Sequence, residues 1–222
     1  MQPRYGAGMN EDRAKQIARD RYYMKLAEAV QEGANCLGSK VGAIVVLRNR
    51  VVSTGYNGTP EDFPNCLDDG CVRCHDSSLF KQGRAAEMSD PSHTSGSALD
   101  RCICVHAEQN AFLTATRFGI ALDGACLYST LSPCFGCLKE AVQVGISRIV
   151  YKGWYQAEYA PALIAQYKAL YGHLSRDNET NFESIGGQRP QIETTGQPDP
   201  YAEPPEIAMS LKPPAAAAED SV

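Results

Sequence analysis

Two short motifs constrain the fold of this chain most strongly. They are HAEQNA, which begins at His106, and SPCFGC, which begins at Ser132. The strand-like stretch CLYSTL lies between them, and each motif stands where a helix is expected to begin. Both motifs carry side chains that bind metals. A fold that uses them together must bring two helix starts to one place beside a strand, which is typical of an α/β protein.

The hydrophobic pattern predicts the order α, β, β, loop, α, β, α, β, α. The expected helices cover residues 10–31, 106–118, 134–144 and 160–170, and the expected strands cover 41–47, 51–55, 125–131 and 147–151. The first two strands should form an antiparallel hairpin, with a turn at residues 48–50. This alternation predicts an α/β sandwich with a mixed sheet.

Two stretches break the pattern. Residues 59–99 are poor in apolar side chains and are expected to form a long loop, with metal ligands fixing at least its first third. The chain beyond about residue 186 turns to Pro, Gln, Thr and Ala and is expected to be disordered. The predicted organisation is a domain over residues 10–180 with a cysteine-rich insertion at about 60–104, and a tail over 187–222.

Net charge, the lengths of apolar runs and the cysteine content limit the functions that this chain can have. The formal net charge of −5 argues against binding to long nucleic acid, because such binding usually requires a basic protein surface. No apolar run reaches about 18 residues and the N-terminus lacks a secretory signal, so a cytoplasmic protein is expected. Nine cysteines in a reducing compartment indicate metal binding or catalysis rather than disulfides.

The two motifs predict one open zinc site. Cys134 and Cys137 are three residues apart and share a helix face, and a helix start favours their thiolate form. With His106 they supply three ligands and leave a fourth tetrahedral position for water, as in catalytic zinc sites. Glu108 is the expected proton carrier. H-x-E followed by P-C-x-x-C is the general signature of zinc-dependent nucleobase deaminases. Either motif alone would also fit chance, a redox pair or buried thiols. Cys126 is interpreted as a core residue.

The order and spacing of several strings resemble the deoxycytidylate deaminases over about residues 13–155: ANCLGSKVGA, VGAIVV, GYNGTP, HAEQNA and TLSPCFGC. The resemblance implies a cytidine-deaminase-like three-layer α/β/α sandwich. It implies conversion of dCMP to dUMP and ammonia, which would supply thymidylate synthesis. It also implies zinc ligation by His106, Cys134 and Cys137, and proton transfer by Glu108.

The resemblance further implies substrate contacts and regulation. Expected substrate-binding residues are Asn57, Ala107, Asn110, Pro133, Tyr151 and Tyr155, although ordinary packing explains either tyrosine equally well. The turn formed by Gly55, Tyr56 and Gly58 is the expected site of a nucleotide effector. Relatives suggest a hexamer that is activated by dCTP with Mg²⁺ and inhibited by dTTP. Lys40, Arg48 and Arg50 are candidate phosphate partners, with solvated charge as the alternative.

Seven metal-capable residues remain outside the catalytic set, too many for one tetrahedral ion. By resemblance to relatives with a structural zinc, the first choice of ligands is Cys36, Cys66, Cys102 and Cys104. Cys71, Cys74 and His75 are alternates and suggest a second structural ion. Free thiols are the alternative for each. A metal here would hold a polar loop that cannot order itself by burial.

Other functions stay open at this point. A related deaminase could act on 5-substituted dCMP, dCTP or tRNA adenosine, although the acidic charge argues against tRNA. Guanine and riboflavin-pathway deaminases fit the motifs less well. A non-catalytic zinc module that binds nucleic acid or protein would have only closed sites, and Glu108 beside a three-ligand set argues against it.

Overall fold

The computed structural model describes residues 7–90, 102–153 and 166, all within the compact unit Met1–Arg189. The helices are α1 (Ala7–Gln31), α2 (Val72–Lys81), α3 (Ala107–Arg117) and α4 (Phe135–Gln143). The strands are β1 (Gly42–Leu47), β2 (Arg50–Tyr56), β3 (Cys126–Leu131) and β4 (Arg148–Gly153). Two short 3₁₀ turns, η1 (Cys66–Asp68) and η2 (Ala85–Glu87), flank α2.

The four strands form one mixed sheet in the order β2-β1-β3-β4. β1 pairs antiparallel with both β2 and β3, whereas β3 and β4 are parallel. The connection from β3 to β4 runs through α4, as parallel neighbours require. The predicted mixed sheet is confirmed.

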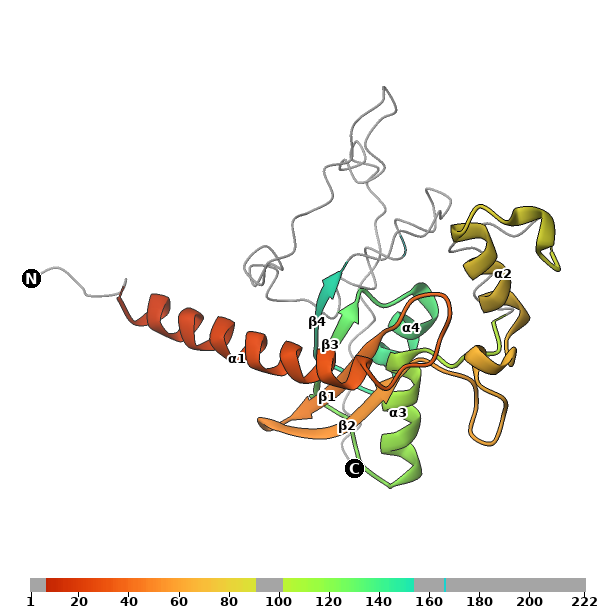
Figure 1. Cartoon of the computed structure of the whole chain (residues 1–222). Helices are drawn as coiled ribbons and strands as arrows, with labels where there is room; N and C mark the ends of the chain where they lie inside the picture. Colours follow the sequence, from red (N-terminus) through yellow and green to blue (C-terminus); the bar gives the residue numbers. More distant parts are fainter. Residues whose placement is uncertain (1–6, 91–101, 154–165, 167–222) are drawn as a thin grey trace, which may run out of the picture. The chain divides into compact units, whose positions relative to one another are not determined.

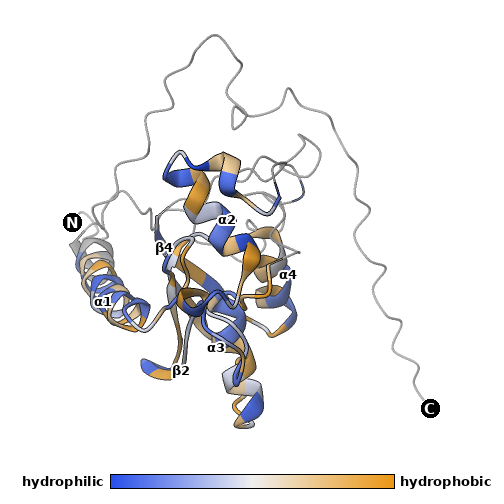
Figure 2. Cartoon of the chain, turned by 45° about the vertical axis from the view of Figure 1, so that its right-hand side comes forward, coloured by the Kyte–Doolittle hydropathy of each residue, from blue (hydrophilic) through white to orange (hydrophobic). Residues whose placement is uncertain are grey.

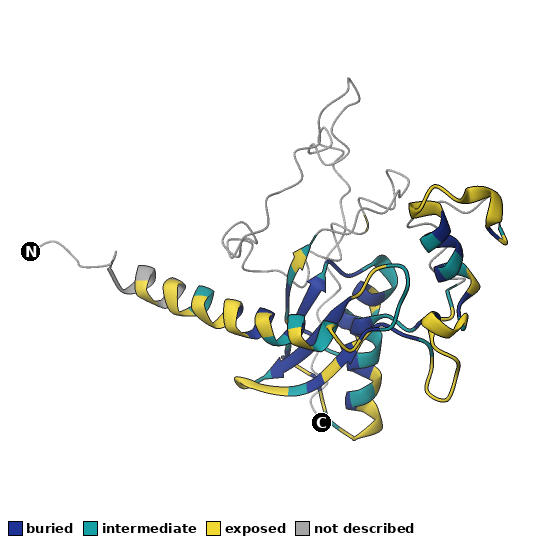
Figure 3. Ribbon diagram, viewed as in Figure 1, coloured by how far each residue is buried: buried dark blue, intermediate teal, exposed yellow. Residues whose placement is uncertain are grey.

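Helices cover both faces of this sheet (Figure 1). On one face, Met24 and Ala27 of α1 pack against Ile44 of β1 and Val150 of β4. On the other, α3 and α4 pack against Val45 and other strand residues in a larger core. The two central strands, β1 and β3, are therefore mostly buried, while much of β2 and of the N-terminal part of α1 is exposed (Figure 3). The structure confirms the three-layer α/β/α sandwich.

The first hairpin has a tighter turn than predicted. Leu47 pairs directly with Arg50, so only Arg48 and Asn49 form the loop. Their φ angles are 50° and 61°, which is the left-handed conformation that two-residue hairpin loops favour. The hairpin prediction is confirmed, and Arg50 belongs to the strand rather than to the turn.

A buried ionic network joins α1 to the strands. Arg148 donates hydrogen bonds to both carboxylate oxygens of Asp20, each across 2.8 Å, and the Tyr128 hydroxyl donates to Asp20 Oδ1 across 2.7 Å. The Asp20 side chain is 3% exposed. Burial and then the neighbouring charges raise the pKa of Tyr128, so its phenol stays a donor. The three residues fix α1 against β3 and β4.

The expectation of a long loop over residues 59–99 is wrong for much of this segment. It contains α2 (Figure 2) and, on either side of it, both 3₁₀ turns. Its buried carboxylate, Asp76, accepts hydrogen bonds from the backbone N–H groups of Ser89 and Asp90 across 2.8 and 2.9 Å. Cysteines supply most of its buried apolar side chains, which is why a pattern of large aliphatic residues did not reveal the helix.

Several predictions lie outside the described residues. These are the helix over 160–170 apart from Gln166, the side chain of Tyr155, the domain boundary near 180 and the tail over 187–222. In the part of the chain that the structure describes, no helix has both the length and the apolar character needed to span a membrane.

Candidate active site

Three metal-capable side chains meet where α3 and α4 begin. His106 is the residue before α3, Cys134 is the residue before α4, and Cys137 lies in the first turn of α4. His106 Nδ1 lies 3.4 Å from Cys134 Sγ and 3.3 Å from Cys137 Sγ, and the two sulfur atoms are 3.6 Å apart. Ligands around one tetrahedral zinc are separated by roughly 3.5–3.8 Å. The three atoms therefore fit three positions around one ion.

The sheet explains why these helix starts meet. Ser129 of β3 pairs with Ala43 at the beginning of β1, so the C-terminal end of β3 lies beside the end of β2 that approaches α3. A short turn at Ser132 and Pro133 then leads from β3 directly into Cys134. The first turns of α3 and α4 therefore lie at the same end of the strands.

Hydrogen bonding within this group separates the pKa values of its members. The hydrogen bond with Cys134 raises the pKa of His106 to about 9. The hydrogen bond with Cys137, followed by that with His106, lowers the pKa of Cys134 to about 4. The same sulfur–sulfur contact, followed by burial, raises the pKa of Cys137. Cys134 is thus the readiest of the two thiols to become a thiolate, the form that binds metal.

Glu108 lies in the first turn of α3 and is only 4% exposed. Burial is the main cause of the raised pKa of its carboxyl group. The hydroxyl of Ser129, at the fully buried centre of β3, donates to Glu108 Oε1 across 3.0 Å. A carboxyl group with a raised pKa and a fixed oxygen is suited to taking up and releasing a proton.

Gln109 supports the same turn. Its Oε1 accepts a hydrogen bond from the His106 backbone N–H across 3.1 Å, and its Nε2 donates to Glu140 Oε1 of α4 across 2.9 Å. Neither Gln109 nor Ser129 was identified from the sequence. The signals were a Gln three residues after the helix cap, and a hydroxyl in an otherwise apolar strand core.

The GYNG turn packs directly on α3. A Cβ atom on Gly55 would lie 2.3 Å from the Ala107 carbonyl oxygen and 2.4 Å from the Ala111 nitrogen, so only glycine allows this approach. The carbonyl of Tyr56 accepts a hydrogen bond from Asn110 Nδ2 across 2.7 Å. Gly58 pairs with Val105, just before His106, in an isolated β-bridge. These contacts give the turn a structural role, and its role in effector binding stays a prediction.

The predicted substrate-binding residues differ in their surroundings. Asn57 accepts a hydrogen bond from the Val41 N–H and donates one to the Ser39 carbonyl, each across 2.7 Å. Its Nδ2 has a second hydrogen, so a nucleotide contact stays a prediction. Ala107 and Pro133 are buried beside the metal-capable residues, and half-buried Tyr151 packs against the α3–α4 core.

The candidate phosphate partners are exposed. Arg48 and Arg50 lie at the hairpin turn, at the opposite end of β2 from Tyr56 and Asn57. A strand of this length spans roughly 20 Å, which separates both arginines from the α3 start. Lys40 lies just before β1 and its carbonyl accepts a hydrogen bond from Gln31. The alternative interpretation, in which the charge is solvated and binds no phosphate, fits both arginines.

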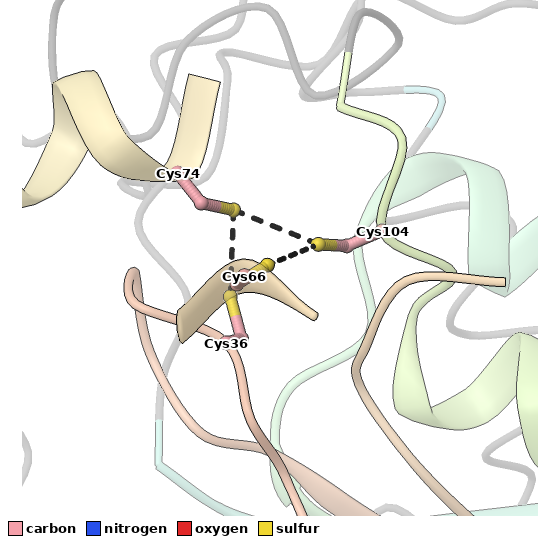
Figure 4. Close-up of side chains that lie close together, drawn as sticks. All are labelled: Cys36, Cys66, Cys74 and Cys104. Atoms are coloured by element: carbon pink, nitrogen blue, oxygen red, sulfur yellow. Dashed lines mark hydrogen bonds between the residues drawn. The ribbon is translucent and has the colours of Figure 1, made fainter. Parts of the chain in front are cut away.

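Six of the other seven cysteines form a second centre. Two overlapping groups each bring four sulfur atoms within 4.8 Å of one another: Cys36, Cys66, Cys74 and Cys104, and Cys71, Cys74, Cys102 and Cys104. The first-choice set combined Cys102 with Cys36 and Cys66, whereas the structure places Cys74 in that position (Figure 4). The undetected helix α2 is the reason, because it turns Cys74 inward. His75 belongs to neither group among the described residues.

Comparison with known proteins gives the same assignment as the motifs. The family described as "Cytidine and deoxycytidylate deaminase zinc-binding region" matches residues 17–152. The chain belongs to this family. The resemblance to the deoxycytidylate deaminases is thereby confirmed. The thiolate–thiolate–imidazole set of this deaminase-family chain is also a donor set that zinc favours, so the residues fit the metal.

Three curated relatives of this deaminase-family chain are each named deoxycytidylate deaminase. The Schizosaccharomyces pombe protein is 36% identical over 66% of this chain and 41% of its own length. The Saccharomyces cerevisiae protein is 38% identical over 67% of this chain and 44% of its own length. The Mycobacterium phage D29 protein is 39% identical over 60% of this chain and 92% of its own length. The chain thus spans less than half the length of the two yeast relatives.

Proposed function

We propose that this protein hydrolyses dCMP to dUMP and ammonia in a zinc-dependent reaction. The observation that carries the proposal is the buried Glu108 carboxyl beside a set of three metal-capable side chains. Within the ranges 7–90 and 102–153, this group contains no fourth His, Cys, Asp or Glu ligand. A structural zinc site would be closed by four protein ligands, whereas a catalytic site keeps one position open. The names of the relatives support dCMP as the substrate.

His106, Cys134 and Cys137 would hold the zinc ion. Bound zinc lowers the pKa of a coordinated water from about 15.7 to roughly 7. Glu108 would take one proton from the attacking water and deliver it to the ring nitrogen N3, and would then carry the second proton, from the hydroxyl group on C4, to the departing amino group. C4 of cytosine then gains the oxygen and loses ammonia. The Ser129 hydroxyl would hold Glu108 Oε1 in place during both transfers.

A spectrophotometric assay tests the proposal, because conversion of cytosine to uracil changes the ultraviolet absorbance. The wild-type protein should turn over dCMP, and Glu108→Ala should lose turnover while it keeps its zinc. Turnover in the variant at the wild-type rate would contradict the role of Glu108. A panel of dC, dCMP, dCTP, 5-substituted dCMP and tRNA adenosine would identify the substrate, with dCMP expected to give the highest kcat/KM.

We further propose that the enzyme is a hexamer, activated by dCTP with Mg²⁺ and inhibited by dTTP. The resemblance to regulated relatives motivates this proposal, and Tyr56, a residue 44% exposed beside the α3 start, is available for stacking on a nucleotide. The dependence of rate on dCMP, with and without dCTP and Mg²⁺, tests regulation, and sedimentation tests assembly. An unresponsive hyperbolic curve would contradict regulation. The nine unbridged cysteines support a proposed cytoplasmic location.

A further inference from the structure

Six cysteines outside the candidate active site gather in one cluster. They come from three separate stretches: Cys36 follows α1, Cys66, Cys71 and Cys74 lie between η1 and the start of α2, and Cys102 and Cys104 lead into α3. Four of them are at most 6% exposed, and the other two pack against these four. None of the six belongs to the His106 group, so the proposed deamination does not account for this cluster.

The cluster divides into two overlapping groups of cysteines. Each of its two groups contains four sulfur atoms, and Cys74 and Cys104 belong to both. Cys36 and Cys66 belong only to the first group, while Cys71 and Cys102 belong only to the second. Six thiolates divided in this way have the connectivity of two tetrahedra that share one edge.

We propose that these six cysteines bind two zinc ions as a binuclear thiolate cluster. Cys36 and Cys66 are terminal ligands of one ion, and Cys71 and Cys102 are terminal ligands of the other. Cys74 and Cys104 bridge both ions. Each zinc then has four sulfur ligands, which is the closed coordination of structural zinc sites.

The sulfur–sulfur distances support this assignment. With Zn–S bonds of about 2.3 Å, the edges of a tetrahedron are roughly 3.8 Å long. The shared edge, Cys74–Cys104, measures 3.7 Å (Figure 4). Other edges measure 3.5 Å for Cys36–Cys74, 3.6 Å for Cys74–Cys102 and 3.7 Å for Cys71–Cys102. Cys66–Cys104, at 3.0 Å, is the one of these edges that must lengthen when zinc binds.

The number of sulfur ligands also favours two ions over one. A single zinc would use only four of the six sulfur atoms and leave two cysteines of the cluster as neutral thiols without a ligand role. Two Zn²⁺ ions reduce the charge of six thiolates from −6 to −2. The backbone N–H of Gly38 donates to Cys36 Sγ across 3.4 Å and stabilises part of the remaining charge. An iron–sulfur cluster needs only four cysteine ligands, so it accounts less well for six.

The proposed cluster would also position the active site. Cys104 lies two residues before His106, and Val105 between them pairs with Gly58. Ions held by Cys104 would therefore fix the segment from which α3 begins, as well as the α2 insertion. The cluster is a positioning element and takes no part in proton transfer.

The test uses the full chain produced in zinc-supplemented medium. Native mass spectrometry and elemental analysis should give three zinc ions per chain, and X-ray absorption should show a zinc–zinc distance of roughly 3 Å, as edge-sharing tetrahedra require. Two or fewer zinc ions per folded chain without zinc–zinc scattering, or iron with inorganic sulfide, would overturn the proposal. None of these measurements depends on a variant that must fold.

Variants separate the two metal centres. Cys134→Ser with Cys137→Ser should lose turnover and one zinc, and keep the zinc–zinc signal, so failure of the proposed deaminase activity leaves this test intact. Cys74→Ser should lose the zinc–zinc signal, because it removes a bridge. Cys126→Ser, in a cysteine that belongs to neither group, should keep all three ions. Persistence of the zinc–zinc signal in folded Cys74→Ser would contradict the bridging assignment.

Discussion

The Ser129 hydroxyl donates a hydrogen bond to Glu108 Oε1 across 3.0 Å, from the buried centre of β3 to the first turn of α3. Ser129→Ala should lower kcat about 10- to 100-fold, since a hydrogen bond to a charged group contributes about 1.5–3 kcal/mol. Steady-state kinetics with dCMP checks this, and the zinc content should not change. Ser53→Ala is the matched control.

The control removes another buried hydroxyl, which donates to the Ala111 carbonyl of α3 and not to the Glu108 carboxyl group. It should lower the free energy of unfolding by about 1 kcal/mol and leave kcat unchanged. Equal kcat values for the two variants would show that Ser129 does not orient the carboxyl group.

Replacing Glu108 with glutamine should remove the proton carrier while preserving the shape of the site. The expected loss in kcat is about 10²- to 10⁴-fold, the usual contribution of general acid–base catalysis. Zinc content should equal that of the wild type, because the proposed ligands are His106, Cys134 and Cys137. Glu87→Gln, in an exposed ion pair with Arg84, is the control and should have wild-type kinetics. Loss of zinc in Glu108→Gln would indicate a ligand role instead.

Gly55→Ala should displace the start of α3. The added Cβ would meet backbone atoms of Ala107 and Ala111, which cannot move aside as a flexible side chain can. We expect a loss of at least about 2 kcal/mol in unfolding free energy, together with weaker zinc retention by the His106 group. Urea denaturation and zinc release to a chelator measure these effects.

Gly119→Ala serves as its control. Gly119 has a φ of 67° with no other atoms near the added Cβ, so the variant reports the backbone cost alone, about 1 kcal/mol. It should leave zinc retention unchanged. If both variants released zinc equally fast, the contact between β2 and α3 would not be what positions His106.

Asp20→Ala should destabilise the fold by about 3–5 kcal/mol, because it leaves the largely buried Arg148 guanidinium without its carboxylate. The more exposed pair of Glu28 and Lys152 provides the comparison, and Glu28→Ala should cost less than about 1 kcal/mol. Chemical denaturation of the two variants tests the difference. Similar losses of unfolding free energy in the two variants would mean that burial does not increase the contribution of the Asp20–Arg148 pair to stability.

Sequence periodicity predicted the sandwich well because its elements follow the ordinary physical rules. The apolar strands, the helix starts at His106 and Cys134 and the short connection after β3 agree with the final arrangement, whereas α1 begins three residues earlier than predicted. The α2 insertion was harder to predict, since its burial depends on Cys66, Cys71 and Cys74 rather than on an aliphatic face. Spacing alone also could not show that Cys74, and not Cys102, joins Cys36 and Cys66.

Residues that support the candidate site were the least visible in the sequence. Ser129 resembles any small residue of a buried strand until β3 is placed beside α3. Gly55 reads as part of a turn, whereas its missing side chain makes room for the first turn of α3. Both roles depend on contacts between segments far apart in the chain, which local patterns do not encode.

The pairing of Gly58 with Val105 has an evolutionary consequence. Gly58 donates to Val105 O across 3.2 Å, and Val105 donates back to Gly58 O across 2.8 Å, so the chain leaves and rejoins the sandwich at one fixed point. A change in the length of the intervening segment during evolution should therefore leave His106 in place, in the same way that an antibody framework tolerates loops of many lengths.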